Sequence, residues 1–265
     1  MTPQLLLQCL DQCQVWPDDA ARAFSPDMAQ AYQISLGIRA LRLARGEQCI
    51  GYKVGFTNRA NWPKQGVDAP MWAAMWASGL VECDGHATVD LSKVCVPRLE
   101  PEIVFGLRSA PVPDASLQSL YECLDWMAPG FEIVRCHAPG GKASAVQAVA
   151  DGGMHSGLVV GRRTPVRDVA PDVRSLDARL AGARLTLRRD GEVIAQGDGT
   201  VVLGSPLQAL HQFLQELHHC PGAPSVEAGD IITTGTWTDA MEVAPGQSWE
   251  AALSDGLGEI TVDFR

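Results

Sequence analysis

The feature that most constrains this fold is a change in sequence texture near residue 48. Before it, the segment from Pro3 to Arg45 repeats apolar residues at helical spacing and stops at Gly46. After it, short runs of β-branched and aromatic residues alternate with turn residues. The runs are IGYKVGF, GLVECDG, TVDL, EIVFGL, FEIVR, SGLVVG, ARLTLRRDGEVIAQG, DIITTGTW and GEITVDF. We therefore predict an α+β fold, with an N-terminal helical region at residues 1–48 and a β-rich catalytic body at residues 49–265.

Two further helices are predicted inside the β-rich body. SLQSLYECLDWMA, residues 116–128, begins with Ser116 as a capping candidate. SPLQALHQFLQELHHC, residues 205–220, begins with Ser205 as a cap and Pro206 at the first helical position. No regular alternation of strand and helix and no GxGxxG motif is present, so a dinucleotide-binding sheet is not indicated.

Turn residues mark one clear hairpin and one excursion. RRDGEV predicts a hairpin with Asp190 and Gly191 in the turn. The proline- and aspartate-containing stretch 162–183 predicts a surface excursion.

Charge and cysteine content narrow the class of partner. The net charge is -10, and the Lys and Arg residues are scattered, so neither nucleic acid nor an anionic membrane is indicated. The first residues lack a basic segment of the signal-peptide kind, and no stretch is apolar enough to span a bilayer. Eight cysteines without a CxxC pair favour reduced thiols in a cytoplasmic protein. We expect a small-molecule partner.

Three glutamates are the candidate metal ligands. In RLEPEIVFG, Glu100 and Glu102 are two residues apart on a predicted strand, so their carboxylates project from the same face. Glu132 lies in the apolar run GFEIV, where a carboxylate needs a reason. Carboxylate oxygens suit Mg²⁺, Mn²⁺ or Ca²⁺. The alternative is that all three are solvated, outward-facing strand positions.

Several segments together resemble a known family. GYKVGFT, GVDAP, RLEPEIVF, GFEIV, VADGG, DIITTGT and the closing GEITVDF resemble, in the same order, the 2-oxopent-4-enoate hydratase and 4-oxalocrotonate decarboxylase family of the fumarylacetoacetate hydrolase superfamily. The resemblance implies a mixed β-roll or barrel preceded by a helical part, which agrees with the pattern above. It also implies a homo-oligomer that serves in aromatic compound catabolism.

The resemblance assigns roles to matching positions. Glu100, Glu102 and Glu132 correspond to ligands of Mg²⁺ or Mn²⁺, and Lys53 corresponds to the lysine of the K-[VI]-G motif. Lys53 would bind the substrate carboxylate or transfer a proton. Outside this motif, an exposed strand lysine would be the simpler interpretation.

Three segments depart from the family pattern. Met71 stands where the family has Asp, and Gly152, Gly153 and Met154 replace Asn, Ala and Ser. Ser205 stands in place of a histidine. These changes spare the predicted ligands and alter the groups that would orient water or the distal end of a substrate, so they place the specificity in question.

The remaining candidates surround these departures. His155 is predicted to replace a missing proton carrier and Asp151 to orient Lys53 or a loop; the alternative for His155 is a hydrogen-bonded loop histidine. The TTGT segment predicts backbone N–H groups near an anionic substrate, or an ordinary tight turn. The predicted substrate-binding residues are Met71, Leu99, Met154, Ser156, Gly235 and Thr236. The apolar residues near Met71 favour either a pocket or ordinary core packing.

The function predicted from these residues is that of a metal-dependent lyase on a small 2-oxo or 2-hydroxydienoate acid. We expect a hydratase that adds water through a metal-chelated enolate. A 4-oxalocrotonate-type decarboxylase is the alternative with the same metal site. A third possibility is a catalytically altered homologue that binds the metal and serves as a partner subunit.

Overall fold

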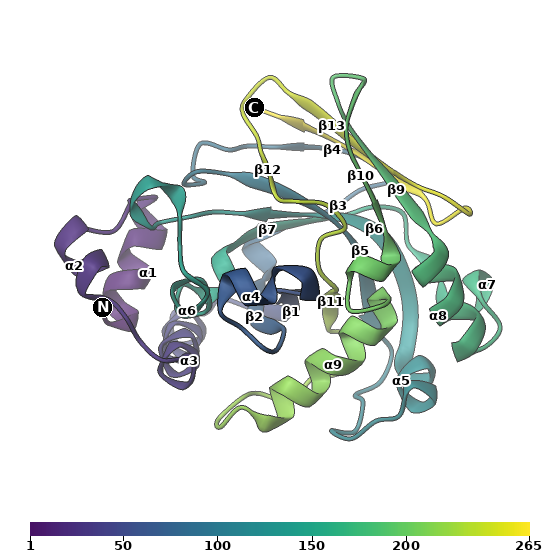
Figure 1. Cartoon of the computed structure of the whole chain (residues 1–265), viewed down its shortest axis with the longest axis horizontal. Coiled ribbons are helices and arrows are strands. Elements are labelled where there is room, and N and C mark those ends of the chain that lie inside the picture. The colour runs from purple at the N-terminus through teal and green to yellow at the C-terminus, as the bar shows by residue number, and fades with distance from the viewer.

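Three helices form the N-terminal part of the computed structural model, which describes residues 1–265 (Figure 1). They are α1 (Pro3–Gln12), α2 (Asp18–Ala23) and α3 (Met28–Ala44). Asp27 caps α3 in a capping box with Gln30, whose backbone N–H donates to Asp27 while its side chain accepts from the Asp27 N–H. The predicted N-terminal helical region is therefore present, as three helices rather than one.

The larger of two sheets is mixed and carries the candidate site. Its path runs β2-β1-β11-β5-β6-β7-β3, with β12 paired to β5 and β8 to β6. The strands are β1 (Cys49–Gly55), β2 (Met71–Trp76), β3 (Leu80–Glu82), β5 (Arg98–Leu107), β6 (Leu124–Val134), β7 (His155–Val160), β8 (Thr164–Pro165), β11 (Ile231–Thr233) and β12 (Met241–Glu242). The neighbouring strands β5 and β6 are the longest of this sheet, and the sheet is curled (Figure 1).

The second sheet is smaller and follows the order β10-β9-β13-β14-β4. Its strands are β4 (His86–Val89), β9 (Arg184–Arg189), β10 (Glu192–Asp198), β13 (Ser248–Leu253) and β14 (Glu259–Phe264). The predicted hairpin joins β9 to β10, and Asp190 and Gly191 both have positive φ, 52° and 85°. Positive φ at both central residues is the requirement of a type I′ turn, and this prediction is confirmed.

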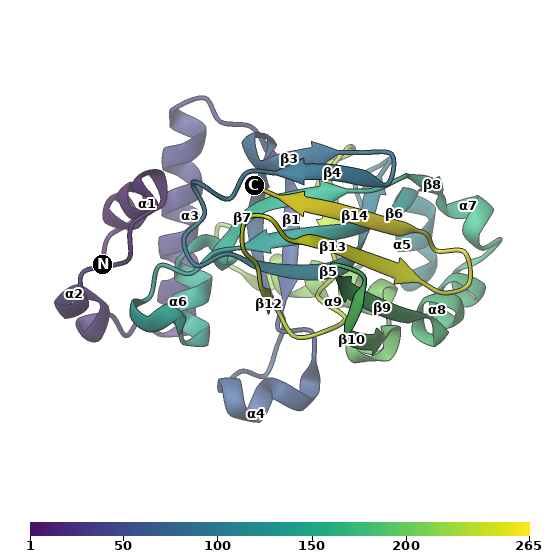
Figure 2. The ribbon, with the colours of Figure 1, turned by 90° about the horizontal axis from the view of Figure 1, so that it is seen from above.

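Six helices of four or more residues accompany the sheets. They are α4 (Trp62–Gln65), α5 (Leu117–Cys123), α6 (Ala145–Ala150), α7 (Val166–Val169), α8 (Val173–Gly182) and α9 (Pro206–His219). Ser205 caps α9 by accepting from the Gln208 N–H at 3.1 Å, and Pro206 occupies the first turn, as predicted. In Figure 2 the N-terminal helices and α6 gather at one end of the sheets, and α4 projects from the body.

The main core lies between the sheets and the helices α5, α8 and α9. It is a cluster of 43 buried residues, in which Phe213 of α9 lies 5.7 Å from Tyr52 of β1 between ring centroids. A separate cluster of 13 buried residues joins the N-terminal helices to α6 and includes Met71. The α+β class is confirmed, while a domain boundary between residues 48 and 49 stays a prediction.

Two local predictions were wrong in part. The helix predicted at residues 116–128 ends at Cys123, and its second half enters β6. Residues 124–128 pair with β5, so the hydrogen bonds of the ladder outweigh local helix propensity there. The stretch 162–183 is not a simple surface excursion, because it forms α7 and α8 and buries Leu176 and Leu180.

No helix of the structure is both long enough and apolar enough to cross a membrane.

Candidate metal site and active-site cavity

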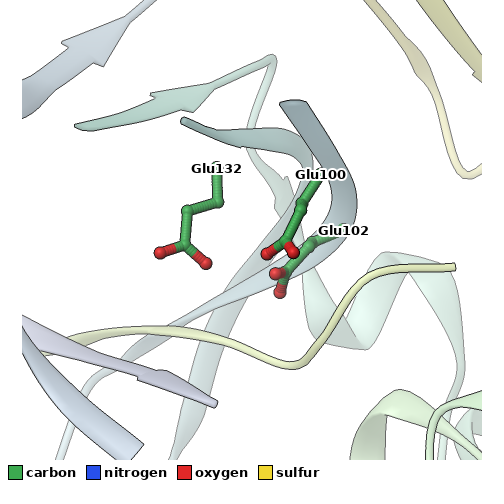
Figure 3. Close-up of side chains that lie close together, drawn as sticks. All are labelled: Glu100, Glu102 and Glu132. Carbon is green, nitrogen blue, oxygen red and sulfur yellow. The ribbon is translucent and has the colours of Figure 1, made fainter. Parts of the chain in front are cut away.

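The three predicted ligands meet on two neighbouring strands. Glu100 and Glu102 are two residues apart on β5 and therefore share one face of the strand. The register of the antiparallel pair sets Glu132 of β6 directly opposite Glu100. Carboxylate oxygens of all three lie within 4.8 Å of one another. Figure 3 shows Glu132 facing Glu100 and Glu102 across a common space. The same-face argument for Glu100 and Glu102 thus holds in the structure.

The carboxylates are deeply placed and incompletely bonded. Glu102 and Glu132 are 1% and 0% exposed, and Glu100 is partly exposed. Glu102 Oε1 and Glu132 Oε2 have no hydrogen-bond partner in the structure. Buried carboxylate oxygens without partners carry a large desolvation cost. These unbonded oxygens therefore favour a positively charged occupant.

Lys53 is the one ammonium group among the glutamates. Its Nζ lies 3.2 Å from Glu132 Oε2, close in distance but without hydrogen-bond geometry, and 3.9 Å from Glu100 Oε2. Nζ donates a hydrogen bond to the Gly153 carbonyl at 3.2 Å. Burial opposes the charge of Lys53, but Glu132, Glu100 and Glu102 outweigh it and raise the pKa of Lys53 above its usual value. Lys53 is therefore an ammonium at neutral pH.

The glutamates differ in how they hold a proton. Burial, partly offset by Lys53, raises the pKa of Glu100 to about 7. Burial and the neighbouring carboxylates also raise the pKa of Glu102 well above its usual value. Burial acts the same way on Glu132, but Lys53 and His155 outweigh it and lower the pKa of that carboxyl. Without a metal, Glu100 and Glu102 therefore tend to hold protons, and a bound cation would displace them.

These groups fit a divalent metal ion. Three carboxylates surrounding a common space face a single ammonium, so the deprotonated trio carries more negative charge than Lys53 can balance. The unbonded lone pairs of Glu102 and Glu132 offer the hard oxygen ligands that Mg²⁺, Mn²⁺ and Ca²⁺ prefer.

Two glycines permit the close approach of backbone to this site. The Gly235 N–H donates to Glu102 Oε2 at 2.5 Å, with φ at +101°. A side chain at Gly235 would meet Thr57 Oγ1 at 2.0 Å. Gly153, whose carbonyl accepts from Lys53, has φ at +70° and leaves 2.6 Å between an added Cβ and Ala73. Both positions therefore require glycine.

A cavity of about 610 Å³ opens beside the glutamates. Lys53 and Glu100 line it, while Glu102 and Glu132 lie deeper. Three predicted substrate-binding residues also line it, namely Met71, Met154 and Thr236. Gly235, a fourth predicted residue, lies next to the buried Glu102, to which its N–H donates a hydrogen bond.

Four other predicted residues lie outside the cavity wall. Leu99 alternates with Glu100 on β5 and faces the main core. Ser156 lines a separate groove. Asp151 does not contact Lys53; its carboxylate accepts from His137 Nδ1 at 2.9 Å. His155 lies behind Glu132, where its Nδ1 donates to Glu132 Oε1 at 2.9 Å.

The position of His155 favours holding Glu132 over proton transfer to a molecule in the cavity. A carboxylate only accepts, so Nδ1 of His155 carries the hydrogen of this bond. Burial lowers the pKa of His155, so the ring is held neutral in the metal-free protein. The hydrogen bond from Nδ1 therefore fixes the orientation of the Glu132 carboxylate, while the second nitrogen, Nε2, faces away from it.

The sequence interpretation missed much of the cavity wall. Phe56, which was not predicted, lines it with left-handed backbone at φ 56°, and the predicted Met154 does so at φ 58°. Such conformations are uncommon for residues other than glycine and cluster at functional sites. Lys64, Trp237 and Asp239 also line the cavity. Phe56 is the last residue of the GYKVGF run and Trp237 directly follows TTGT, so their place in or beside those motifs was the available signal.

The fold and this site together define a class of protein. The class is an α+β protein in which a curled mixed sheet presents carboxylates alone to a metal ion, with one buried lysine beside them.

Comparison with known proteins gives the family. The model of the fumarylacetoacetate (FAA) hydrolase C-terminal family matches residues 78–265, and this chain belongs to that family. It is 28% identical to a 4-oxalocrotonate decarboxylase of Pseudomonas putida over 90% of this chain and 87% of that one. It is 30% identical to the same-named protein of Pseudomonas sp. (strain CF600), over 84% and 81%. It is 29% identical to a 2-keto-4-pentenoate hydratase of Paraburkholderia xenovorans (strain LB400), over 91% and 86%.

Solved structures agree on the fold. A 4-oxalocrotonate decarboxylase from Pseudomonas putida G7, complexed with magnesium and adipate, superimposes with a TM-score of 0.87 at 24% identity, covering 99% of this chain and 95% of that one. A fumarylpyruvate hydrolase from Pseudomonas aeruginosa, in complex with Mn²⁺ and pyruvate, gives 0.59 at 19% identity, covering 82% and 89%. The predicted fumarylacetoacetate hydrolase type of fold and the predicted family are confirmed.

Proposed function

We propose that this protein is a metal-dependent lyase that acts on a small 2-oxo or 2-hydroxydienoate acid, first of all as a hydratase that adds water. The observation that carries the proposal is the trio Glu100, Glu102 and Glu132 with Lys53 beside a cavity large enough for such an acid. Relatives with the name 2-keto-4-pentenoate hydratase and 4-oxalocrotonate decarboxylase support it.

Glu100, Glu102 and Glu132 would hold Mg²⁺ or Mn²⁺. Related structures contain magnesium, calcium and Mn²⁺, which supports a divalent cation. When bound, the ion supplies a Lewis acid that polarises the oxygens of an oxo-acid. His155 keeps Glu132 oriented for this role through its 2.9 Å hydrogen bond.

The chain's own residues account for the rest of the chemistry. Lys53 holds a proton at Nζ next to the cavity, so it can bind the substrate carboxylate or deliver a proton to the dienoate carbon chain. Met71, Met154 and Phe56 form apolar wall that limits access of water to that chain. Thr236 and the backbone of Gly235 stand at the polar end, beside Glu102.

Decarboxylation of a 4-oxalocrotonate-type diacid is the second candidate. Lys64 of α4 lines the cavity with the neighbouring Asn58 and Asn61, and a second substrate carboxylate would find a cation there. Asp239 on the same wall opposes this. The relative that superimposes with a TM-score of 0.87 was complexed with adipate, a dicarboxylate.

One set of assays tests both candidates. The purified protein with Mg²⁺ or Mn²⁺ is incubated with 2-hydroxydienoates and with oxalocrotonate-like diacids while dienoate absorbance and released CO₂ are recorded. Loss of the dienoate without CO₂ supports the hydratase, and release of CO₂ supports the decarboxylase. No turnover of any diene acid contradicts the lyase proposal and favours a metal-binding partner subunit.

A lysine variant makes the choice between candidates sharper. Lys64→Met should raise KM for diacids about tenfold and leave KM for monoacids unchanged, because only a second carboxylate would reach Lys64. Lys142→Met is the matched control, since Lys142 is exposed and lies outside the cavity wall. Equal effects of both variants on both substrates would remove the argument for a diacid.

We further propose that the protein works as a cytoplasmic homo-oligomer in aromatic compound catabolism, as the family resemblance implies. Sedimentation analysis of the purified chain tests the oligomeric state.

A further inference from the structure

A small chamber lies on the opposite face of β2 from the active-site cavity. Met71 of β2 faces the cavity, whereas Trp72 faces the chamber, as alternation along a strand requires. Helix α3 closes the chamber from outside, and Arg135 and His155 close it at the end of β6 and the start of β7. The chamber leaves about 20 Å³ for the centre of a water-sized sphere. A single water needs at least about 10 Å³ by this measure, so there is room for one or two small particles.

Four buried polar atoms without a hydrogen-bond partner belong to residues that line this chamber. They are Arg39 Nε, Trp72 Nε1, Arg135 Nε and His155 Nε2. The first three are donors in every accessible protonation state, whereas His155 Nε2 is an acceptor, because the neutral ring carries its hydrogen on Nδ1. Native proteins pair the large majority of such atoms, so a group of four around one space indicates an occupant.

Arg135 gives the most direct indication. Its side chain is buried, with the residue 5% exposed, and its guanidinium forms no ion pair or hydrogen bond with another residue. Burial opposes its charge and lowers the pKa of Arg135, with Asp151 only partly offsetting the effect. Asp151 itself is bonded to His137. A buried guanidinium Nε that lacks a hydrogen-bond partner needs an acceptor from elsewhere.

The wider surroundings of the chamber are also cationic. Arg42 also lines the chamber, although Glu47 pairs with it, and Asp151 is the one acidic residue on the wall, where it bonds to His137. Arg42 and Arg135 also line an adjoining groove of about 540 Å³. The groove's charged residues are the basic Arg42, Arg45, Lys93, Arg135 and Arg265 and the acidic Asp11, Glu47 and Asp90. This excess of basic groups, in a chain of net charge -10, would attract anions to the chamber.

We propose that the chamber is a binding site for a small inorganic anion of halide size, held by Arg135, Arg39 and the indole N–H of Trp72. A halide accepts hydrogen bonds and donates none, which matches a space bordered mainly by unpaired donors. A water molecule would find acceptors in His155 Nε2 and the Asp151 carboxylate, so water is the competing occupant that the experiment must distinguish from an anion. Carboxylate and phosphate groups carry several heavy atoms and exceed the space of the chamber.

Such an anion links the N-terminal helices to the metal site. Arg39 lies on α3 and Trp72 on β2, while Arg135 follows Glu132 by three residues. An occupied chamber therefore fastens α3 to the strands that carry the ligands. An anion that binds only the folded state raises the melting temperature by an amount that grows with the logarithm of the ratio of anion concentration to Kd.

Bromide is the probe that tests this proposal. Crystals of the protein grown in bromide should show an anomalous peak in the chamber, within hydrogen-bonding distance of Arg135 Nε and Trp72 Nε1. A peak of water density without an anomalous signal would overturn the proposal. This measurement uses the unaltered chain, so it decides the matter even if a variant fails to fold.

Thermal unfolding gives an independent measurement. At equal ionic strength and fixed magnesium, replacing gluconate by bromide should raise Tm by about 2 °C or more, the shift typical of ~1 kcal/mol in a chain of this size. Arg135→Gln should abolish the shift. Arg163→Gln is the matched control and should keep it, because Arg163 pairs with Glu82 and lies against Trp126 away from the chamber. An equal shift in both variants would contradict the proposal.

Discussion

The active-site cavity and the chamber behind it lie on opposite faces of β2 and are electrostatic opposites. The cavity side gathers three carboxylates around one ammonium, with Glu102 Oε1 and Glu132 Oε2 unbonded. The chamber side gathers guanidinium groups and an indole, with Arg135 Nε and Trp72 Nε1 unbonded. His155 lies between the two, with one nitrogen on Glu132 and the other unbonded on the chamber side.

This difference shows that buried polar atoms without partners can indicate the charge of the ligand that a site binds. In both places the chain alone leaves polar atoms unsatisfied, and the sign of the unpaired groups predicts the charge of what is bound. The carboxylate side fits a divalent cation, and the guanidinium side fits an anion. The four experiments that follow act on this contrast.

The largest effect is expected from Lys53→Met, which removes the one ammonium beside the three glutamates. The metal-free protein should lose about 3 kcal/mol or more of unfolding free energy, because breaking a buried ion pair leaves uncompensated charge. Urea unfolding in EDTA measures this, and added Mn²⁺ should restore part of the loss. Lys142→Met is the exposed control. Unchanged stability in Lys53→Met would show that Lys53 does not compensate the glutamates.

Glu102→Gln should weaken metal binding and activity by about 100-fold or more, since a neutral amide replaces a charged ligand. Calorimetric titration with Mn²⁺ measures the affinity, and circular dichroism checks the fold. Glu250→Gln serves as control, because Glu250 pairs with Arg188 on the smaller sheet. If metal content is unchanged in both Glu102→Gln and Glu132→Gln, the metal site lies elsewhere.

His155→Leu should weaken metal binding by about 10-fold to 100-fold, the range typical for groups that orient a ligand. His155→Asn keeps a donor near the position of Nδ1, so it should recover most of the affinity. A proton-transfer role would instead lower kcat in both variants at saturating metal. Comparing metal affinity with kcat therefore separates positioning from proton transfer.

The smallest effect concerns pH. Because the pKa of Glu100 is raised to about 7, this carboxyl is protonated below that pH and must lose its proton to bind a cation. Metal affinity should therefore fall as pH drops through 7, by up to about tenfold per unit for one released proton. Titrations from pH 6 to 8 measure this dependence. Glu100→Gln should flatten it, whereas equal slopes in both proteins would contradict the assignment.

Local sequence patterns anticipated many elements. The two-residue spacing of Glu100 and Glu102 predicted that both carboxylates share one face, because side chains on a strand return to the same face every two residues. The Asp190-Gly191 turn was predictable because few residues adopt positive φ readily. Caps at Ser116 and Ser205 were equally local signals.

Other features escaped because they depend on partners distant in the chain. Residues 124–128 have a helical pattern but join β6, since pairing with β5 satisfies their backbone. The burial of Leu176 and Leu180 depends on α8 meeting the main core. Asp151 was expected to orient Lys53 or a loop, and the structure pairs it with His137 and not with Lys53.

By itself, the sequence determined the α+β class, the family and the glutamates that form the candidate metal site. Local periodicity and motif order carry that information, because they depend on neighbours in the chain. Only the tertiary structure decided that Glu132 stands opposite Glu100, that His155 supports it from behind, and that Arg135 faces a chamber. Strand register and helix packing fix those contacts, and they arise only when distant segments bury their surfaces together.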